Sequence, residues 1–433
     1  MDTNKSMVST LVKEPVTFLG GVLLFLMAFS PAYNMALKIV LIGILLVAVL
    51  FSQIFFDRLN LTKAVLLWYF LFVAHSIIFT AIGLINRNNT MYVLKSATYN
   101  IIWPIVYLLF TVGIYKKSSL RFLIQTIAVS NIFISLYLIG GLFTILHILP
   151  PLSGIDFSMS SLSFDTLAGL LKIESPAVIC LLFTMPFIIC VRLTDGERTF
   201  GLNKLFISIS ILITIVAVLA TARRALILNI FLSLPLTFIF VRLAPALNKR
   251  AFNRRLLNML LLGAGLLTLV IIIAEASGLF NFSLVYEKFI SAFSSRGDLE
   301  DVSTSTRYDQ FELLVKSWLQ KPLIGFGHGA VSRYIIRSYK TPWIYELSYV
   351  ALLFQTGVLG LSAYLALLAW PIYKGIQIIR KANTETCIFL IPCLVGCACF
   401  LIANATNPYL QSYDYMWTLF FPVAVINYFL KTR

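Results

Sequence analysis

Long apolar stretches recur along the whole chain and are separated by short polar connections. Each is close to the roughly 20 residues that a helix needs to cross the hydrocarbon core of a bilayer. About twelve such stretches are therefore predicted to be membrane-spanning helices. They lie near residues 16–33, 35–56, 64–85, 98–115, 121–149, 176–193, 205–221, 225–244, 256–275, 347–373, 386–404 and 416–430. They leave no room for a separate soluble domain, so residues 1–433 are predicted to form one all-α transmembrane domain.

The composition agrees with a polytopic membrane protein. The 433 residues are 59% hydrophobic and only 12% charged, and the mean hydropathy is +0.91, far above that of soluble domains. A net charge of +16 would suggest nucleic acid as the partner of a soluble protein. In a membrane protein the same charge sets topology, so no nucleic-acid partner is predicted and membrane lipids are the expected surroundings.

The cations concentrate in alternate connections between the predicted helices. By the positive-inside rule these connections and both termini are expected to be cytoplasmic. The first helix is expected to be a retained signal anchor. The cations of this set are Lys5, Lys13, Arg58, Lys63, Lys116, Lys117, Arg121, Arg192, Arg198, Lys204, Lys249, Arg250, Arg254, Arg255, Lys374, Arg380, Lys381, Lys431 and Arg433.

The cysteines and histidines suggest no metal or disulfide chemistry. The six cysteines lie inside apolar stretches, where cysteine behaves as a small hydrophobic residue. The three histidines, His75, His147 and His328, are scattered and form no ligand pattern with them. No metal and no cofactor is predicted.

Three outer connections depart from this pattern. The first, residues 150–176, is interpreted as an interfacial lid, with substrate contact by Asp156, Asp165 or Glu174 as the alternative. The second is the pair Arg223 and Arg224, set between two apolar runs. A charge near membrane depth is costly unless it is paired or lines a polar cavity, so this pair is a candidate site, and snorkelling to the interface is the alternative. Neighbouring helical residues point about 100° apart, so one of the two is expected to face a given cavity.

The third exception is the long outer segment 276–346, between the ninth and tenth predicted helices. A helix is predicted from Thr306 to Gln320, with Ser305 or Thr306 as N-cap and Asp309 in the first turn. Arg307 is then placed at a helix start, where a cation is unfavourable, and it could hold an anion together with the helix N-terminus. The alternative is a solvated arginine at a loop end. The apolar residues expected to face the membrane domain are Phe311, Leu314, Val315, Trp318 and Leu319.

Glycines cluster after this helix, in "PLIGFGHGA" from Pro322. A Walker loop would need Lys followed by Ser or Thr, and a dinucleotide fingerprint would need to join a strand to a helix. Neither is present in the sequence, so Gly325, Gly327 and Gly329 are predicted to form a tight turn that approaches a neighbouring backbone closely.

The order of these pieces resembles the O-antigen ligase and Wzy-type polysaccharide polymerase family. Residues 205–370 carry the resemblance. The matching elements are Arg223 with Ala225 and Leu226, Arg307 with Trp318, the "PLIGFGHGA" turn, and Tyr349 with Gly357 and Gly360. Ligases of the family have His followed by Asn, Ser or Gln ahead of a Gly-x-x-Gly element. Glu346 occupies that histidine position here, which favours the polymerase branch.

The resemblance implies a GT-C-like membrane fold and a metal-independent glycosyltransferase at the outer face of the cytoplasmic (inner) membrane. Such enzymes transfer glycan from undecaprenyl pyrophosphate to a sugar hydroxyl, and a flippase and a chain-length regulator are the implied protein partners. On this basis Arg223 and Arg307 are expected to bind the pyrophosphate, and Glu346 to orient or deprotonate the acceptor hydroxyl. The further residues expected to bind substrate are Arg224, His328, Arg333, Arg337, Lys340, Trp343, Tyr345 and Tyr349.

Several of these residues also have an interpretation that involves no substrate. The aromatic residues could form an interfacial belt, and Arg333, Arg337 and Lys340 could contact lipid phosphates. An O-antigen ligase and a secondary transporter or flippase are the competing functions. Transporters usually place polar or helix-breaking residues near the midplane of paired halves, whereas the unusual charges of this chain gather in outer connections.

Overall fold

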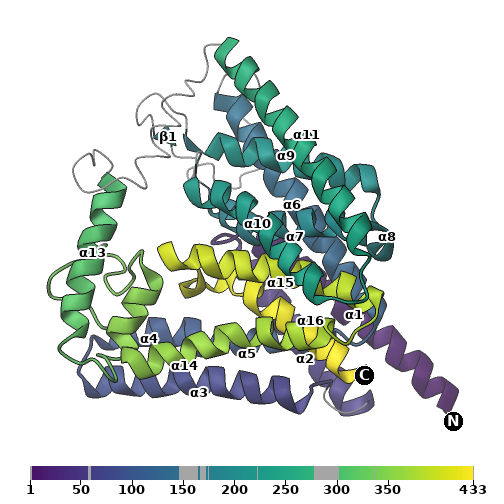
Figure 1. The fold of residues 1–433 in the computed structure, drawn as a ribbon. Coiled ribbons are helices and arrows are strands. Elements are labelled where there is room, and N and C mark those ends of the chain that lie inside the picture. Colours follow the sequence, from purple (N-terminus) through teal and green to yellow (C-terminus); the bar gives the residue numbers. More distant parts are fainter. Residues whose placement is uncertain are drawn as a thin grey trace.

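A computed structural model describes residues 2–56, 60–145, 164–165, 172–173, 175–221, 223–276, 302–336 and 338–432. The described chain is almost entirely helical (Figure 1). The α-helices are α1 (Asp2–Phe29), α2 (Met35–Phe56), α3 (Lys63–Ile85), α4 (Thr90–Ala97), α5 (Trp103–Gly113), α6 (Lys117–Ile145), α7 (Leu181–Leu193), α8 (Gly196–Phe200), α9 (Lys204–Thr221), α10 (Arg224–Leu243), α11 (Lys249–Ala276), α13 (Val302–Trp318), α14 (Ser348–Ile379), α15 (Thr384–Ala403) and α16 (Trp417–Lys431).

Short elements complete the described chain. A π-helix, η1 (Thr98–Ile102), joins α4 to α5. The 3-10 helices are η4 (Pro176–Cys180), η5 (Asn404–Thr406), η6 (Tyr409–Gln411) and η7 (Tyr413–Tyr415). In the 150–176 connection, β1 (Phe164–Asp165) pairs antiparallel with β2 (Lys172–Ile173). Asp156 and Glu174, the other two acids considered for this connection, lie outside the described residues.

The protein is a helical membrane protein with several crossings. The described residues of the twelve predicted apolar stretches lie mostly in helices, and seven helical segments of the described chain are long and apolar enough to cross a bilayer. Three shorter apolar segments, from α1, α2 and α9, do not reach that length in the described residues. The fourth span starts earlier than predicted, at Thr90, because η1 joins α4 and α5 into one continuous rod. Twelve crossings and a GT-C-like fold remain predictions.

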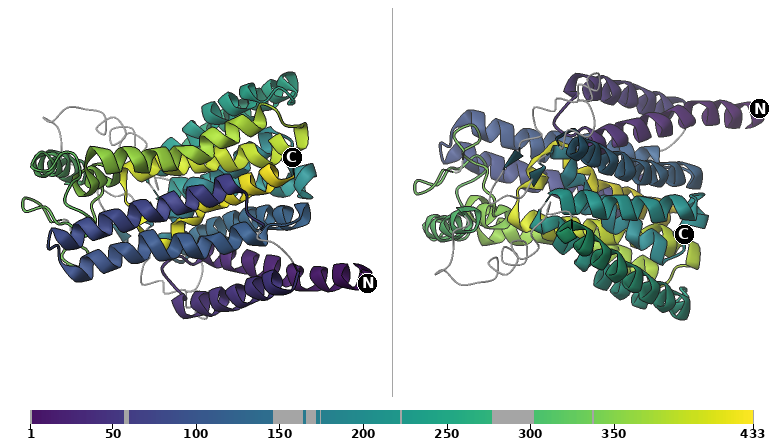
Figure 2. Two further views of the ribbon diagram at one scale, coloured as in Figure 1. Left: turned by 90° about the horizontal axis from the view of Figure 1, so that it is seen from below. Right: turned by 90° about the horizontal axis from the view of Figure 1, so that it is seen from above.

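The helices pack around α7 and α15, which are the most deeply buried spans. α15 contacts α7, α10, α14 and α16, while α1 packs on α2 and α6. In Figure 2, α1 and α2 lie along one edge of the bundle and α11 along the opposite edge. All six cysteines are buried among these helices with free thiols, as predicted for small hydrophobic residues.

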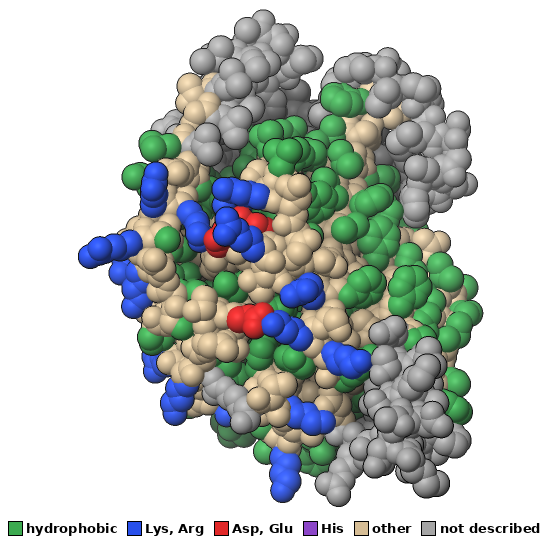
Figure 3. Space-filling model, turned by 90° about the vertical axis from the view of Figure 1, so that its right-hand side faces the viewer, with side chains coloured by type: hydrophobic (Ala, Val, Ile, Leu, Met, Phe, Trp, Pro, Cys, Tyr) green, Lys and Arg blue, Asp and Glu red, His purple; other side chains and the backbone are tan. Residues whose placement is uncertain are grey.

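Lys and Arg side chains gather at the end of the bundle that carries the termini. Both termini lie at this end, and α13 stands at the other (Figure 1). Figure 3 faces the terminal end and shows Lys and Arg side chains spread over it, with two small acidic groups among them. Asp195, on the connection between α7 and α8, meets Arg255 on α11 at 2.9 Å.

The glycine turn fits into a break in α14. Gly357 interrupts that helix with φ 66° and ψ −174°, so neighbouring backbone groups lose their helical partners. The turn supplies replacements: Val358 N donates to Pro322 O at 2.9 Å, and Gly327 N donates to Gln355 O at 2.6 Å. A Cβ on Gly325 would lie 2.6 Å from Gly357 N, which no side chain tolerates. The predicted tight turn with close backbone approach is confirmed.

The same turn also binds α3. His328 N donates to Phe79 O at 2.8 Å, and the side chain of Asn88 donates to Phe326 O at 2.9 Å. The turn therefore joins α3 to α14, and it fixes the chain that leads from α13 to Glu346.

The start and the buried face of α13 differ from the prediction. The helix begins at Val302, four residues before Thr306, so Ser305 and Thr306 do not cap it and Asp309 is not in its first turn. The Ser and Thr residues after Val302 continue the helix, and Asp301 directly precedes it in the sequence. Arg307 thus lies in the second turn of α13. The expectation that it binds an anion together with the helix N-terminus is therefore not supported.

The buried stripe of α13 consists of Gln310, Leu314 and Ser317. Phe311 and Leu319, predicted to face the membrane domain, are 51% and 62% exposed. Leu314 packs in an apolar cluster with Ala351 and Phe354 of α14, and the two polar residues flank it on the same stripe.

Candidate functional site

Three charged residues from distant parts of the chain meet at the end of the bundle that carries α13. Arg307 Nε donates a hydrogen bond to Glu346 Oε2 at 2.8 Å. Arg223, directly before α10, lies within interacting distance of the Tyr409 hydroxyl on η6. Arg307 and Glu346 also lie close enough to Tyr409 to shift the pKa of its hydroxyl. The sequence predicted these three residues as one site, and the structure brings them together around a tyrosine.

Glu346 is held by α13 as well as by its own chain. Gln310 is buried and lies three residues after Arg307, so both side chains leave the same side of α13. Its Oε1 accepts a hydrogen bond from Glu346 N at 3.0 Å. Glu346 is therefore held twice by α13: its carboxylate accepts from Arg307, and its backbone N donates to Gln310.

Tyr409 is positioned by the polar segment between α15 and α16. Asn404 accepts a hydrogen bond from Leu410 N at 2.9 Å, and its amide donates to Ser348 Oγ at 3.2 Å. Ser348 in turn donates to Asn404 O. The start of α14, two residues after Glu346, is thereby tied to the segment that carries Tyr409.

The electrostatics of this cluster favour an anion. Burial raises the pKa of Tyr409, Arg223 and Arg307 act in the opposite direction, and Glu346 adds to the rise. Burial is the largest cause, so the hydroxyl is neutral at neutral pH and can donate a hydrogen bond. Two guanidinium groups then face one carboxylate. Arginine suits phosphate groups because its planar fork donates paired hydrogen bonds and stays charged.

Arg223 and Arg224 differ in backbone conformation. Arg223 is extended before the helix, while Arg224 is the first residue of α10. Both are partly buried. Arg223 interacts with Tyr409, and the expectation that at most one of the two faces the site stays a prediction.

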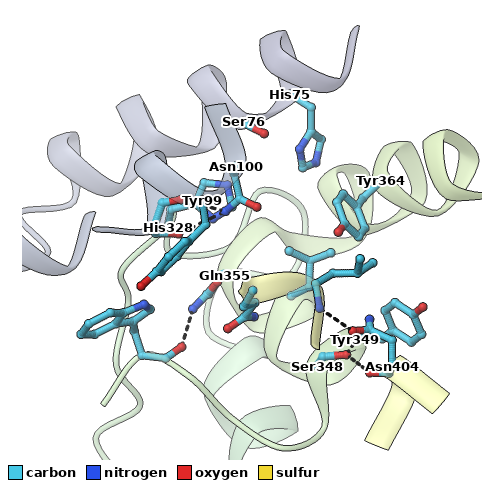
Figure 4. A pocket seen from close by; sticks show the side chains of 15 residues that line it. His75, Ser76, Tyr99, Asn100, His328, Ser348, Tyr349, Gln355, Tyr364 and Asn404 are labelled. Atoms are coloured by element: carbon cyan, nitrogen blue, oxygen red, sulfur yellow. Dashed lines mark hydrogen bonds between the residues drawn. The ribbon is translucent and has the colours of Figure 1, made fainter. Parts of the chain in front are cut away.

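Next to the cluster lies a cavity of about 30 Å³ that is lined by polar, aromatic and leucine side chains (Figure 4). The segment 404–411 separates the two, since Leu410 and Gln411 line the cavity while Tyr409 meets the arginines. The lining residues are His75, Ser76, Ser96, Tyr99, Asn100, His328, Trp343, Ser348, Tyr349, Leu352, Gln355, Tyr364, Asn404, Leu410 and Gln411. They include three residues predicted to bind substrate, namely His328, Trp343 and Tyr349.

Tyr345, Arg333 and Lys340, also predicted to bind substrate, do not line the cavity. Tyr345 is fully buried, with Ser332 N donating to its hydroxyl at 2.8 Å, and it packs with Leu314 and Phe354. The expected substrate contact of Tyr345 is therefore corrected to a structural role, because its ring is enclosed by α13 and α14. Arg333 and Lys340 are exposed on the outer segment, and Arg337 lies outside the described residues.

Sequence reasoning missed Tyr409, Gln310 and Asn404. Each is an ordinary polar residue in a polar stretch, and no spacing marks it. One signal was present: "NATNPYLQSYDY", from Asn404, is unusually polar for a connection between two apolar helices.

Within the described residues, no group of three His, Cys, Asp or Glu side chains is placed to hold a metal ion. The fold and site thus define a helical membrane protein with a cationic cluster beside a small cavity. No protein-family model and no curated protein matches the chain.

Proposed function

We propose that this protein is a polysaccharide polymerase of the Wzy type. It would transfer a growing glycan from undecaprenyl pyrophosphate to the hydroxyl of a new lipid-linked repeat unit. The observation that carries the proposal is the convergence of Arg223, Arg307 and Glu346 around Tyr409. The family resemblance points to these three residues, which are spread over more than a hundred positions of the sequence. Residues so far apart would rarely meet if they did not share a site.

The chemistry follows from the charges. The acceptor oxygen attacks the anomeric carbon, the bond from that carbon to the pyrophosphate oxygen breaks, and the pyrophosphate leaves with the electron pair. Arg223 and Arg307 stabilise the charge that develops on the leaving oxygen. Glu346 accepts the hydroxyl proton as the new glycosidic bond forms.

The contact between Arg307 and Glu346 is compatible with both roles. It uses Nε, and the guanidinium carries further N–H groups on its two terminal nitrogens. A pyrophosphate arriving at those nitrogens draws the arginine away from Glu346. The carboxylate is then available to the acceptor hydroxyl.

The proposed topology has twelve crossings, both termini in the cytoplasm and the cluster at the outer face of the cytoplasmic membrane. It is supported by the cations at the terminal end of the bundle and by α13 at the other end (Figures 1 and 3). A lipid-linked donor would present its pyrophosphate at that outer level.

The test is polymer length in membranes that contain single variants. Arg223→Gln, Arg307→Gln and Glu346→Gln are each expected to reduce chain extension by about 100-fold or more, which is typical of losing a charge-stabilising donor or a general base. The single repeat unit on its carrier should accumulate. Arg333→Gln is the matched control, since Arg333 is exposed on the same outer segment.

Two outcomes would count against the assignment. Normal ladders with Glu346→Gln would exclude the base role of Glu346. Full-length polymer that remains on the carrier in the absence of the protein would indicate the competing ligase function instead.

A further inference from the structure

The cavity of Figure 4 contains a buried histidine, His328, whose ring packs beside Phe79 and His75. His328 is 3% exposed, and within the described part of the chain neither ring nitrogen makes a hydrogen bond. A buried polar atom without a partner costs about 1–3 kcal/mol, so such an atom is normally satisfied by water or a ligand. His75, the other histidine of the cavity, differs because its Nε2 donates to Gly360 O at 3.0 Å.

The ring of His328 is neutral in this setting. Burial lowers its pKa to about 3, and the neighbouring His75 adds to the effect. A neutral imidazole presents one N–H donor and one acceptor. A hydroxyl group also offers one donor and accepting lone pairs, so the two are complementary.

The polar neighbours of His328 are uncharged. None of the described residues that line the cavity is Lys, Arg, Asp or Glu. Gln355 lies within interacting distance of His328, and its Nε2 is held by Trp343 O at 3.0 Å. Tyr99 and Asn100 reach the cavity from the π-helix η1, a type of irregular helix that is frequently found at functional sites.

The size of the cavity limits what it can hold. A volume of about 30 Å³ accommodates two water molecules or two hydroxyl groups, since one such group needs roughly 10–15 Å³. It is too small for a whole sugar ring. The ligand that fits is the hydroxyl-bearing edge of a ring that stays outside.

We propose that this cavity is a subsite for the hydroxyl groups of a neutral sugar, with His328 and Gln355 as the recognising side chains. The proposal rests on the polymerase function and assigns the sugar to the acceptor. The reason is position: Ser348, Leu410 and Gln411 line the cavity, and the same two segments carry Glu346 and Tyr409. The anionic pyrophosphate would bind where Arg223 and Arg307 approach the segment 404–411. The uncharged sugar would bind in the cavity with His328.

Binding can be tested without activity. Trp343 lines the cavity, so its fluorescence in the purified full-length protein, taken as the difference from Trp343→Phe, should respond to a neutral methyl hexoside. A saturable response that is at least about tenfold weaker for the matching uronic acid is expected, because a carboxylate would enter an uncharged cavity.

His328→Leu is the decisive variant. Its ring makes no hydrogen bond to the described protein, so the melting temperature should not fall, while affinity for the hexoside should drop about tenfold or more. His75→Leu is the matched comparison and should lower the melting temperature, since it loses the bond to Gly360 O. An equal hexoside response in wild type and His328→Leu, no saturable response in wild type, or equal binding of the uronic acid would overturn the subsite.

Failure of this inference is distinguishable from failure of the polymerase function. If wild type extends chains and His328→Leu does so with an unchanged KM for the acceptor, the subsite is excluded and the polymerase stands. If no polymer depends on the protein but His328→Leu still abolishes hexoside binding, the sugar site stands and the polymerase does not.

Discussion

Two ion pairs of this molecule, Lys38–Asp414 and Arg307–Glu346, differ in their access to solvent. Lys38 on α2 and Asp414 on η7 meet at 2.6 Å, and their side chains are 0% and 1% exposed. Arg307 and Glu346 meet at 2.8 Å with side chains that are 33% and 17% exposed. The first pair is sealed, and the second is open to a ligand.

The sealed pair has protein partners at both of its ends. Lys38 Nζ also donates to Ser30 O at 2.7 Å, and Ala32 N donates to Asp414 Oδ2 at 2.6 Å. Ala32 has φ 64°, a conformation that is uncommon outside glycine. The pair therefore fastens the turn between α1 and α2 to the segment 404–416. The contrast is one of burial: protein encloses the first pair, whereas solvent reaches the second.

The largest expected effect comes from breaking the sealed pair. Lys38→Met leaves a buried, unpaired carboxylate, which typically costs about 3–5 kcal/mol. The double variant Lys38→Met with Asp414→Asn should regain much of this stability, because no charge remains buried. Unfolding in detergent measures both, and a loss below about 1 kcal/mol for Lys38→Met would contradict the sealed pair.

A smaller effect is expected at the support of the open pair. Gln310→Leu removes the acceptor of Glu346 N and should cost about 1–3 kcal/mol in unfolding free energy. Gln320→Leu, at an exposed position just after the same helix, serves as its control and should be close to neutral. Equal melting temperatures for the two variants would show that Gln310 does not hold Glu346.

The open pair itself should contribute little to stability. Arg307→Gln is expected to change the unfolding free energy by no more than about 1 kcal/mol, since partly exposed pairs are weak. Chain extension should nevertheless collapse. A destabilisation as large as that of Lys38→Met would make Arg307 structural and remove the distinction between the two pairs.

The smallest effect at neutral pH concerns Tyr409. Because burial raises its pKa, the unfolded chain loses this phenolic proton near pH 10 while the folded chain keeps it. Stability is therefore retained below about pH 10 and falls as the pH rises further. Tyr409→Phe should show a shallower loss of melting temperature between about pH 9 and 11 than wild type. Identical slopes would mean that Tyr409 titrates equally in both states.

The sequence pointed to the open pair, Arg307 and Glu346, and not to the sealed pair. Apolar stretches of spanning length located the helices, and unusual charges in outer connections identified Arg223, Arg307 and Glu346. Arg223 stood out because a charge near membrane depth is costly, and Arg307 because a cation is unfavourable at a helix start. Glu346 stood out because it occupies the histidine position of the ligase motif in the family resemblance.

The sealed pair and the inner detail of the site were not predictable. Lys38 and Asp414 are 376 positions apart, and nothing local to either residue names its partner. Tyr345 carries the same sequence signal as Tyr349, yet packing of α13 on α14 encloses one and leaves the other beside the cavity. The predicted start of α13 was wrong because Ser and Thr occur both at the N-cap position and inside helices.

The break in α14 also defines a unit for protein engineering. The turn after Pro322 and the break at Gly357 satisfy each other's backbone groups, so neither segment is self-sufficient. A graft that moved the outer segment onto another membrane scaffold would need everything from Pro322 to Leu359 as one insert. A cut between them would leave a helix with unpaired carbonyl groups and a loop with no surface to pack on.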